Sequence, residues 1–153
     1  QRAARLWPDK AQFVGILGDV GRGKTRLAWA IARHLHRNRK YVTVVDCRCA
    51  QVEWMASQSR EAITQKWMRA GLLILDDISG GSISQGWRAC LEKVIDARKQ
   101  ETRPTMICTH ISGDAFETIF GTALRSRLAL YRWLNWPATE RDRRKPKENS
   151  DVG

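Results

Sequence analysis

Short apolar runs alternate with amphipathic helical patterns along the 153 residues of the chain. The apolar runs predict five strands: Phe13 to Leu17, Tyr41 to Val45, Leu72 to Leu75, Thr105 to Thr109 and Tyr131 to Leu134. Helical spacing predicts helices in between: Lys24 to about Arg37, Ala50 to Ala70, Gln85 to Gln100, a short one between Ser112 and Gly121, and Thr122 to Leu128. This alternation indicates an α/β fold with a five-stranded parallel sheet covered by helices.

Local features sharpen this outline. The side-by-side β-branched residues of Tyr41 to Val45 predict a strand covered on both faces. Ser112 suits the N-cap of its short helix, and Gly121 suits the end of that helix. After Pro137 the chain is charged and almost without apolar residues. We therefore expect one domain over residues 1–136 and a basic, mostly disordered tail over 137–153.

The charge balance favours a polyanionic partner. Lys and Arg number 27 against 16 Asp and Glu, which gives a net charge of +11. Hydrophobic residues make up 42% of the chain, enough for a folded core. The longest apolar runs fall far short of the ~20 residues that span a bilayer, so we expect no membrane partner. Four irregularly spaced cysteines without a CxxC pair indicate reduced thiols in a cytoplasmic protein.

The strongest chemical signal is a phosphate-binding motif. Residues 18–25 read GDVGRGKT and fit GxxxxGK[ST] between a predicted strand and a predicted helix. Its glycines let backbone N–H groups wrap a phosphate at a helix N-terminus. Lys24 would reach the β- and γ-phosphates of ATP, and the Thr25 hydroxyl would hold Mg²⁺. The expected nucleotide-binding residues are Gly18, Asp19, Val20, Gly21, Arg22, Gly23, Lys24, Thr25 and Arg26.

Two carboxylates follow the third predicted strand. Leu72 to Leu75 is an apolar strand that ends in Asp76 and Asp77, about fifty residues after Lys24. We expect Asp76 to orient Mg²⁺ with its water shell, and Asp77 to polarise the attacking water.

Taken together, these motifs resemble the AAA+ ATPase module of the DnaC-type helicase loaders, whose relatives include the IstB-type transposition helper ATPases. Arg103 to His110 resembles the family's Arg-Pro-Thr strand, whose polar tip is sensor 1; Thr109 matches, and His110 replaces the family's Asn. Residues 121–128 resemble the box that supplies an arginine finger, with Arg127 at the finger position. The Asn135-Trp136 ending resembles that of loaders without a full C-terminal helical lid.

This resemblance implies a three-layer P-loop NTPase that binds ATP and Mg²⁺ and assembles into an ATP-dependent homo-oligomer. It assigns catalytic roles to Asp77, His110 and Arg127. Family members often end the acidic pair in Glu, so the shorter Asp77 implies slow hydrolysis. The helicase-contacting region of the family precedes the ATPase core, and we expect it to be absent from this sequence. A phage origin is a further hypothesis.

DNA contacts are expected between Trp54 and Arg69, where the loaders carry helices that face single-stranded DNA. Arg60, Lys66 and Arg69 are the candidate contacts, whereas Trp54 and Trp67 at helical spacing are more typical of a core.

The favoured function is a loader that engages single-stranded DNA and a replicative hexameric helicase. Three alternatives remain open: a transposition helper that binds duplex DNA and recruits a transposase, a P-loop kinase of a small acceptor, and a nucleotide-gated DNA-binding protein with negligible turnover.

Overall fold

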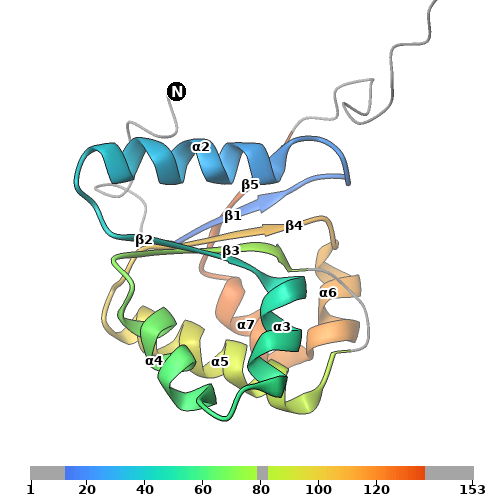
Figure 1. Ribbon diagram of the computed structural model, residues 1–153. Coiled ribbons are helices and arrows are strands. Elements are labelled where there is room, and N and C mark those ends of the chain that lie inside the picture. The colour runs from blue at the N-terminus through green and yellow to red at the C-terminus, as the bar shows by residue number, and fades with distance from the viewer. Residues whose placement is uncertain (1–12, 79–82, 137–153) are drawn as a thin grey trace, which may run out of the picture.

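A computed structural model describes residues 13–78 and 83–136 of the chain. Its centre is a five-stranded, wholly parallel sheet with the order β2-β3-β4-β1-β5 (Figure 1). The strands are β1 (Phe13–Leu17), β2 (Val42–Asp46), β3 (Leu72–Ile78), β4 (Thr105–Thr109) and β5 (Arg132–Asn135). The carboxyl ends of all five strands therefore meet at one edge, where α/β sheets bind their ligands.

Helices cover both faces of the sheet, as the resemblance implied. In Figure 1, α2 (Lys24–Arg37) lies alone on one face, and all the other helices of the described residues lie on the opposite face. These are α3 (Cys47–Ala56), α4 (Arg60–Arg69), α5 (Gln85–Gln100), α6 (Gly113–Phe120) and α7 (Thr122–Leu128). The prediction of an α/β three-layer fold is confirmed. No helix in residues 13–78 or 83–136 has the length and apolar content to cross a bilayer.

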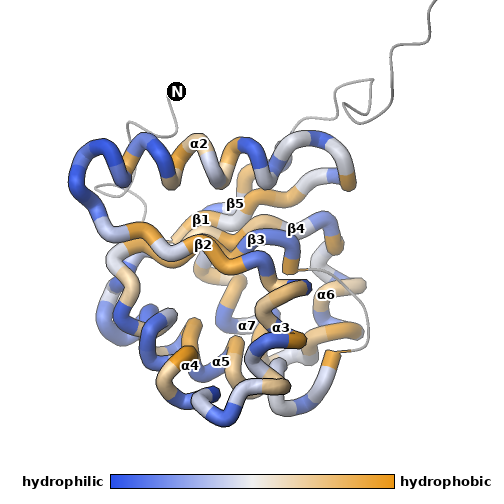
Figure 2. Tube along the Cα trace, in the orientation of Figure 1, coloured by the Kyte–Doolittle hydropathy of each residue, from blue (hydrophilic) through white to orange (hydrophobic). Residues whose placement is uncertain are grey.

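The apolar core has two halves because successive strand residues point to opposite faces. On β3, Leu72 and Ile74 pack with Ala28, Ile31 and other α2 residues. Leu73 and Leu75 pack instead against the five-helix layer. Only one side of α2 takes part, and in Figure 2 that helix accordingly alternates between orange and blue along its length.

The structure tests three local predictions, of which only the first needs correction. The stretch from Ala50 to Ala70 is two helices, because the Ser57 hydroxyl accepts the backbone N–H of Ser59 (2.9 Å) and ends the first helix. Strand β2 lies at the sheet edge but is covered on both faces as predicted, because Val42 and Val44 pack in the α2 half of the core and Val45 packs in the other half. Ser112 occupies the predicted N-cap position of α6, although its side chain accepts no capping hydrogen bond.

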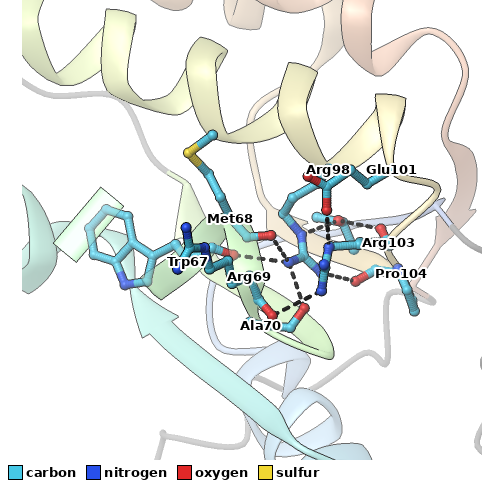
Figure 3. A network of polar contacts seen from close by, with 9 residues as sticks. Trp67, Met68, Arg69, Ala70, Arg98, Glu101, Arg103 and Pro104 are labelled. Carbon is cyan, nitrogen blue, oxygen red and sulfur yellow. Dashed lines mark hydrogen bonds and ion pairs between the residues drawn. The ribbon is translucent and has the colours of Figure 1, made fainter. Parts of the chain in front are cut away.

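A fully buried arginine fastens α4 to α5 and β4. Arg98 is 0% exposed, and its guanidinium donates to Thr105 Oγ1 (2.9 Å). It also donates to backbone carbonyl oxygens at the end of α4 and before β4, those of Trp67, Met68, Ala70 and Pro104 (Figure 3). Burial lowers the pKa of Arg98 to about 10. No carboxylate of the described residues pairs with it, so the partial negative charge of the α4 carboxyl end takes that role.

Candidate nucleotide-binding site

The loop between β1 and α2 has the backbone that phosphate binding requires. Gly21 and Gly23 have φ of 80° and 92°, which L side chains rarely adopt. Gly23 is also the N-cap of α2, so no side chain caps the helix, and its first turn contains no acidic residue. The free N–H groups and the positive end of α2 therefore remain available to an anion.

Lys24 is folded back into this loop. Its ammonium donates to the carbonyl oxygens of Gly18 and, at 2.8 Å, of Asp19. Burial lowers the pKa of Lys24, and the nearby carboxylates, Asp77 first, oppose that shift. The loop thus places a cation among its own carbonyl oxygens, within reach of the phosphate cradle.

Trp136 supports the phosphate-binding loop through a hydrogen bond. The residue follows β5, and its indole N–H donates to the carbonyl oxygen of Arg22 (2.9 Å). A Cβ at Gly18 would lie 3.0 Å from the Trp136 side chain and 3.1 Å from its carbonyl oxygen, so a larger residue there would displace Trp136 by a few tenths of an ångström. Arg22 Nη1 is buried and has no hydrogen-bond partner among the described residues. An unpaired buried cationic donor in this loop suits a phosphate oxygen.

Asp76 and Thr25 come together at the loop, from β3 and the first turn of α2. The Thr25 side chain lies close enough to the Asp76 carboxylate to lower its pKa. Asp76 is only 5% exposed, and its Oδ1 atom has no partner among the described residues. Burial outweighs Thr25 and raises the pKa of Asp76. The predicted metal-holding pair is therefore adjacent, with one carboxylate oxygen left unsatisfied.

These residues fit Mg²⁺ in the manner of a nucleotide site. Mg²⁺ is typically held by one or two protein groups plus phosphates and waters, not by a cage of side chains. The described residues contain no group of three or more His, Cys, Asp or Glu that could hold a metal ion. An unsatisfied carboxylate oxygen beside a hydroxyl is the donor set expected of such a site.

Asp77 lies at a backbone irregularity near the end of β3. Between Leu75 and Ile78, the register of β3 against β4 shifts by one residue. Asp77 adopts a φ of 53°, which is uncommon for a residue other than glycine. Such backbone irregularities cluster at functional sites, where they re-aim a side chain.

The Asp77 carboxylate has a basic side chain beside each oxygen. Arg48 Nε lies 2.9 Å from Oδ2, and His110 Nδ1 lies 3.6 Å from Oδ1. Sequence reasoning selected Asp77 and His110 but missed Arg48. The signal was its position two residues after β2, whose carboxyl end meets the same edge of the sheet.

Thr109 holds the tip of β4 against β3. Its hydroxyl donates to the carbonyl oxygen of Ile78 (2.6 Å) and accepts the N–H of Ile111 (3.1 Å). Thr109 is fully buried, so it positions His110 beside Asp77 without facing the site itself. A mainly apolar cavity of about 330 Å³ lies nearby, but residues 18–25 do not line it. Its lining residues are Leu17, Ile111, Gly113, Phe116, Arg125, Leu128, Ala129 and Trp133.

Arg127 lies elsewhere on the molecule. Its Nε donates to Asp96 Oδ1 on α5 (2.6 Å), and its Nη1 donates to the Ala123 carbonyl oxygen. The hydrogen bond that Arg127 donates to Asp96 is the largest cause of the raised pKa of Arg127. Among the described residues, none of its partners belongs to the phosphate-binding loop, so Arg127 is not assembled with the predicted site in this chain.

The predicted DNA contacts lie on α4, in different surroundings. The guanidinium of Arg60 lies 5.3 Å from the centroid of the Trp54 ring and donates to a backbone carbonyl of α3. Lys66 and Arg69 are exposed, with no carboxylate partner in the described part of the chain. Trp67 is a core residue, as its helical spacing indicated.

The family profile of the "IstB-like ATP binding protein" matches residues 2–135. The chain belongs to this family. The replicative helicase loader DnaC of Escherichia coli (strain K12) is 27% identical over 135 residues, which cover 82% of this chain and 55% of that loader. The loader of Shigella flexneri aligns with the same values. The family member described here thus spans little more than half the length of these curated relatives.

Solved structures agree on the fold. The crystal structure of the DnaC helicase loader superposes with a TM-score of 0.74 at 17% identity, covering 89% of this chain and 87% of that chain. The replication initiator DnaA bound to AMPPCP and single-stranded DNA superposes with a TM-score of 0.77 at 15% identity, covering 93% of this chain and 46% of that chain. The fold is therefore that of a P-loop AAA+ domain.

Proposed function

We propose that this chain is the AAA+ ATPase module of a replicative helicase loader, which hydrolyses Mg²⁺-bound ATP and engages single-stranded DNA. The observation that carries the ATPase proposal is the buried Asp76, with an unsatisfied oxygen and a Thr25 partner at the mouth of the phosphate-binding loop. A buried, unsatisfied carboxylate costs stability, and metal coordination would offset that cost.

The phosphate-binding loop would hold the triphosphate through its backbone N–H groups. Lys24 would exchange the loop carbonyl oxygens for the β- and γ-phosphates, and Arg22 would supply its unpaired Nη1. Thr25 and Asp76 would hold Mg²⁺, which neutralises phosphate charge when bound.

Asp77 would orient a water for attack. The carboxylate is ion-paired with Arg48, so it must leave that partner before it can accept a proton. His110 beside it would donate a hydrogen bond toward the γ-phosphate. The short Asp77 side chain and its ion pair with Arg48 both favour slow turnover.

Arg127 would act on the nucleotide of a neighbouring subunit in an ATP-dependent homo-oligomer. Its own chain gives it no contact with the phosphate-binding loop, and its Nη2 atom has no partner among the described residues. The contact with Asp96 would have to loosen, at least in part, when a neighbour docks. An arginine supplied across an interface accelerates phosphoryl transfer by stabilising charge in the transition state.

DNA and the helicase are the proposed partners. The curated relatives named above are helicase loaders, which supports replication over the transposition-helper alternative. Lys66 and Arg69 on α4 would contact phosphates, whereas Arg60 is engaged with Trp54 and would contribute less. A cytoplasmic location is consistent with this role.

Two variants test the nucleotide site. Lys24→Ala should abolish ATP binding, measured by titration with a fluorescent ATP analogue, and should leave the circular dichroism spectrum unchanged. Asp77→Asn should keep ATP binding and lower steady-state phosphate release by at least ~10²-fold, the usual contribution of a positioned base. Equal phosphate release by Asp77→Asn and the parent would place the base elsewhere or mean that turnover is negligible.

Mixing tests the shared active site. Arg127→Ala and Lys24→Ala subunits each retain the half-site that the other lacks, so a 1:1 mixture should regain ATPase activity. Glu92→Ala, on the neighbouring turn of α5, is a matched surface control that should behave like the parent. A mixture that stays inactive although both variants enter parental oligomers would make Arg127 an ordinary surface charge.

A third experiment tests the partners. Lys66→Ala/Arg69→Ala should weaken binding to a labelled single-stranded oligonucleotide, and the slope of log affinity against log salt should flatten by ~0.7 per lost phosphate contact. A strong preference for duplex would favour the transposition helper. Co-purification of the full-length protein with a hexameric helicase, rather than with a transposase, is the expected result.

A further inference from the structure

A long stretch of the chain that includes α2 contains no acidic residue. From Val20 to Val45 there is no Asp or Glu, whereas seven residues are Lys or Arg. In residues 46–136, by contrast, 12 Lys and Arg are nearly balanced by 10 Asp and Glu, and some of them form ion pairs, as Lys93 does with Glu61 and Arg127 does with Asp96. The uncompensated charge of the molecule is therefore concentrated around α2.

The outward side of α2 combines part of this charge with an aromatic ring. Trp29, Arg33 and Arg37 follow one another at intervals of four residues, about 6 Å along the helix axis, and all three are exposed. We call these three residues the outer stripe. Arg33 Nε lies 3.4 Å from the Trp29 carbonyl oxygen, and neither Arg33 nor Arg37 forms an ion pair within the described residues. The opposite side of α2 packs on the sheet.

Trp29 differs from the tryptophans that the fold uses. Trp54 is half-buried, its indole N–H donates to Thr64 Oγ1 (3.0 Å), and it packs against Trp87. Trp29 is 49% exposed, and its indole N–H has no hydrogen-bond partner in the described part of the chain. A single exposed apolar side chain is ordinary, but an exposed indole aligned with two unpaired guanidinium groups matches the composition of a surface that binds single-stranded nucleic acid.

We propose that the outer stripe binds single-stranded nucleic acid, with a base stacked on Trp29 and the neighbouring phosphates on Arg33 and Arg37. This inference rests on the proposed function only in taking DNA as the polyanion. It adds a second contact surface, because α2 and α4 lie on opposite faces of the sheet (Figure 1). A loader that holds DNA on both faces would retain the strand more firmly than one with a single surface.

The chemistry favours a single strand over duplex DNA or a membrane. A flat ring needs an unpaired base face, which stacked duplex DNA hides. An interfacial membrane helix inserts a broad apolar face, but the apolar residues of α2, such as Ala28, Ile31 and Leu35, are buried against the sheet. The exposed apolar residues of α2 are only Trp29 and the small Ala30.

Fluorescence anisotropy of a labelled 20-nucleotide oligo-dT tests the proposal on the whole chain. Trp29→Ala should weaken binding about 10-fold, and Trp29→Phe, which retains a ring, should recover part of that loss. Arg33→Ala/Arg37→Ala should flatten the salt slope by ~1.4, two phosphate contacts at ~0.7 each. Lys99→Ala/Arg132→Ala removes the same charge from exposed positions outside α2 and should leave both quantities unchanged. ATP binding should match the parent in every variant, which shows that the fold is intact.

Several results would overturn the proposal. Equal losses in the two double variants would mean that only net charge matters. Unchanged binding in the outer-stripe variants, with loss in Lys66→Ala/Arg69→Ala, would confine DNA to α4 and leave the proposed function standing. Absence of oligonucleotide binding by the parent would remove both DNA surfaces. Equally tight binding of a 20-base-pair duplex, or binding to anionic phosphatidylserine vesicles in place of DNA, would assign the stripe to another polyanion.

Discussion

Replacing Arg98 by methionine should destabilise the fold at the end of α4. Methionine fills a similar volume but has no donor, so four backbone carbonyl oxygens and the Thr105 hydroxyl each lose a hydrogen bond. The Pro104 carbonyl oxygen keeps its bond from the Leu73 N–H, and the Thr105 hydroxyl keeps its bond to the Arg103 carbonyl oxygen. The bonds to Thr105 and to the Trp67 carbonyl are fully buried, and water cannot replace them. The other three lie in partly buried positions that water can reach in part.

The net effect follows from two opposing contributions. Each unsatisfied buried polar group costs about 1–3 kcal/mol, and each partly buried bond is worth about 1 kcal/mol. Against this, the variant no longer buries a guanidinium, whose desolvation costs several kcal/mol and already lowers the pKa of Arg98 to about 10. We therefore expect a net loss of about 3 kcal/mol in the free energy of unfolding, a large share of the ~5–15 kcal/mol typical of a domain.

Urea unfolding followed by circular dichroism measures this loss. The midpoint should fall while the m-value stays constant, because the surface exposed on unfolding is nearly the same. Lys99→Ala, the exposed neighbour on α5, is the control and should shift the free energy by less than ~0.5 kcal/mol. Equal midpoints for Arg98→Met and Lys99→Ala would refute the assignment of Arg98 as the fastening of α4.

Three further perturbations follow from the structure. Asp76→Asn should raise the melting temperature in the absence of nucleotide and Mg²⁺, because burial disfavours the charged carboxylate. The same variant should weaken Mg²⁺-dependent ATP binding. A lower melting temperature would contradict the first expectation. Trp136→Phe removes the hydrogen bond from the indole N–H to the Arg22 carbonyl oxygen and should weaken ATP binding about 5-fold, with little change in the unfolding midpoint. An unaltered affinity would show that this bond does not support the phosphate-binding loop. Ser84→Ala should cost about 1 kcal/mol of stability because its hydroxyl caps α5, whereas Ser112→Ala should cost only a few tenths, and equal costs would refute the distinction.

Hydrophobic periodicity and one glycine-rich motif were enough to predict the architecture. The helices Gln85–Gln100 and Thr122–Leu128 and the strand Thr105–Thr109 have the predicted bounds, because local spacing and turn residues determine where such elements begin and end. The phosphate-binding loop was equally predictable from the sequence, since its glycines and Lys24 act through local backbone geometry. Burial of the tryptophan at position 67 also followed from spacing alone.

Only the tertiary structure decided how distant residues meet. The position of Arg48 just after β2 indicates the right edge of the sheet but not that Asp77 is its partner. Nothing in the local sequence pattern indicates that Trp136 hydrogen-bonds Arg22 or that Arg127 pairs with Asp96. Strand order and helix packing bring each of these pairs together. The edge position of β2 likewise depends on the order of strands, which local pattern does not specify. The sequence alone shows that Arg98 is a charged residue on the buried side of α5. The carbonyl oxygens that accept its hydrogen bonds come from the end of α4 and from the residue before β4, so only the tertiary structure identifies them. Local sequence therefore determines elements and loops through short-range sterics, whereas partners across the fold depend on long-range packing.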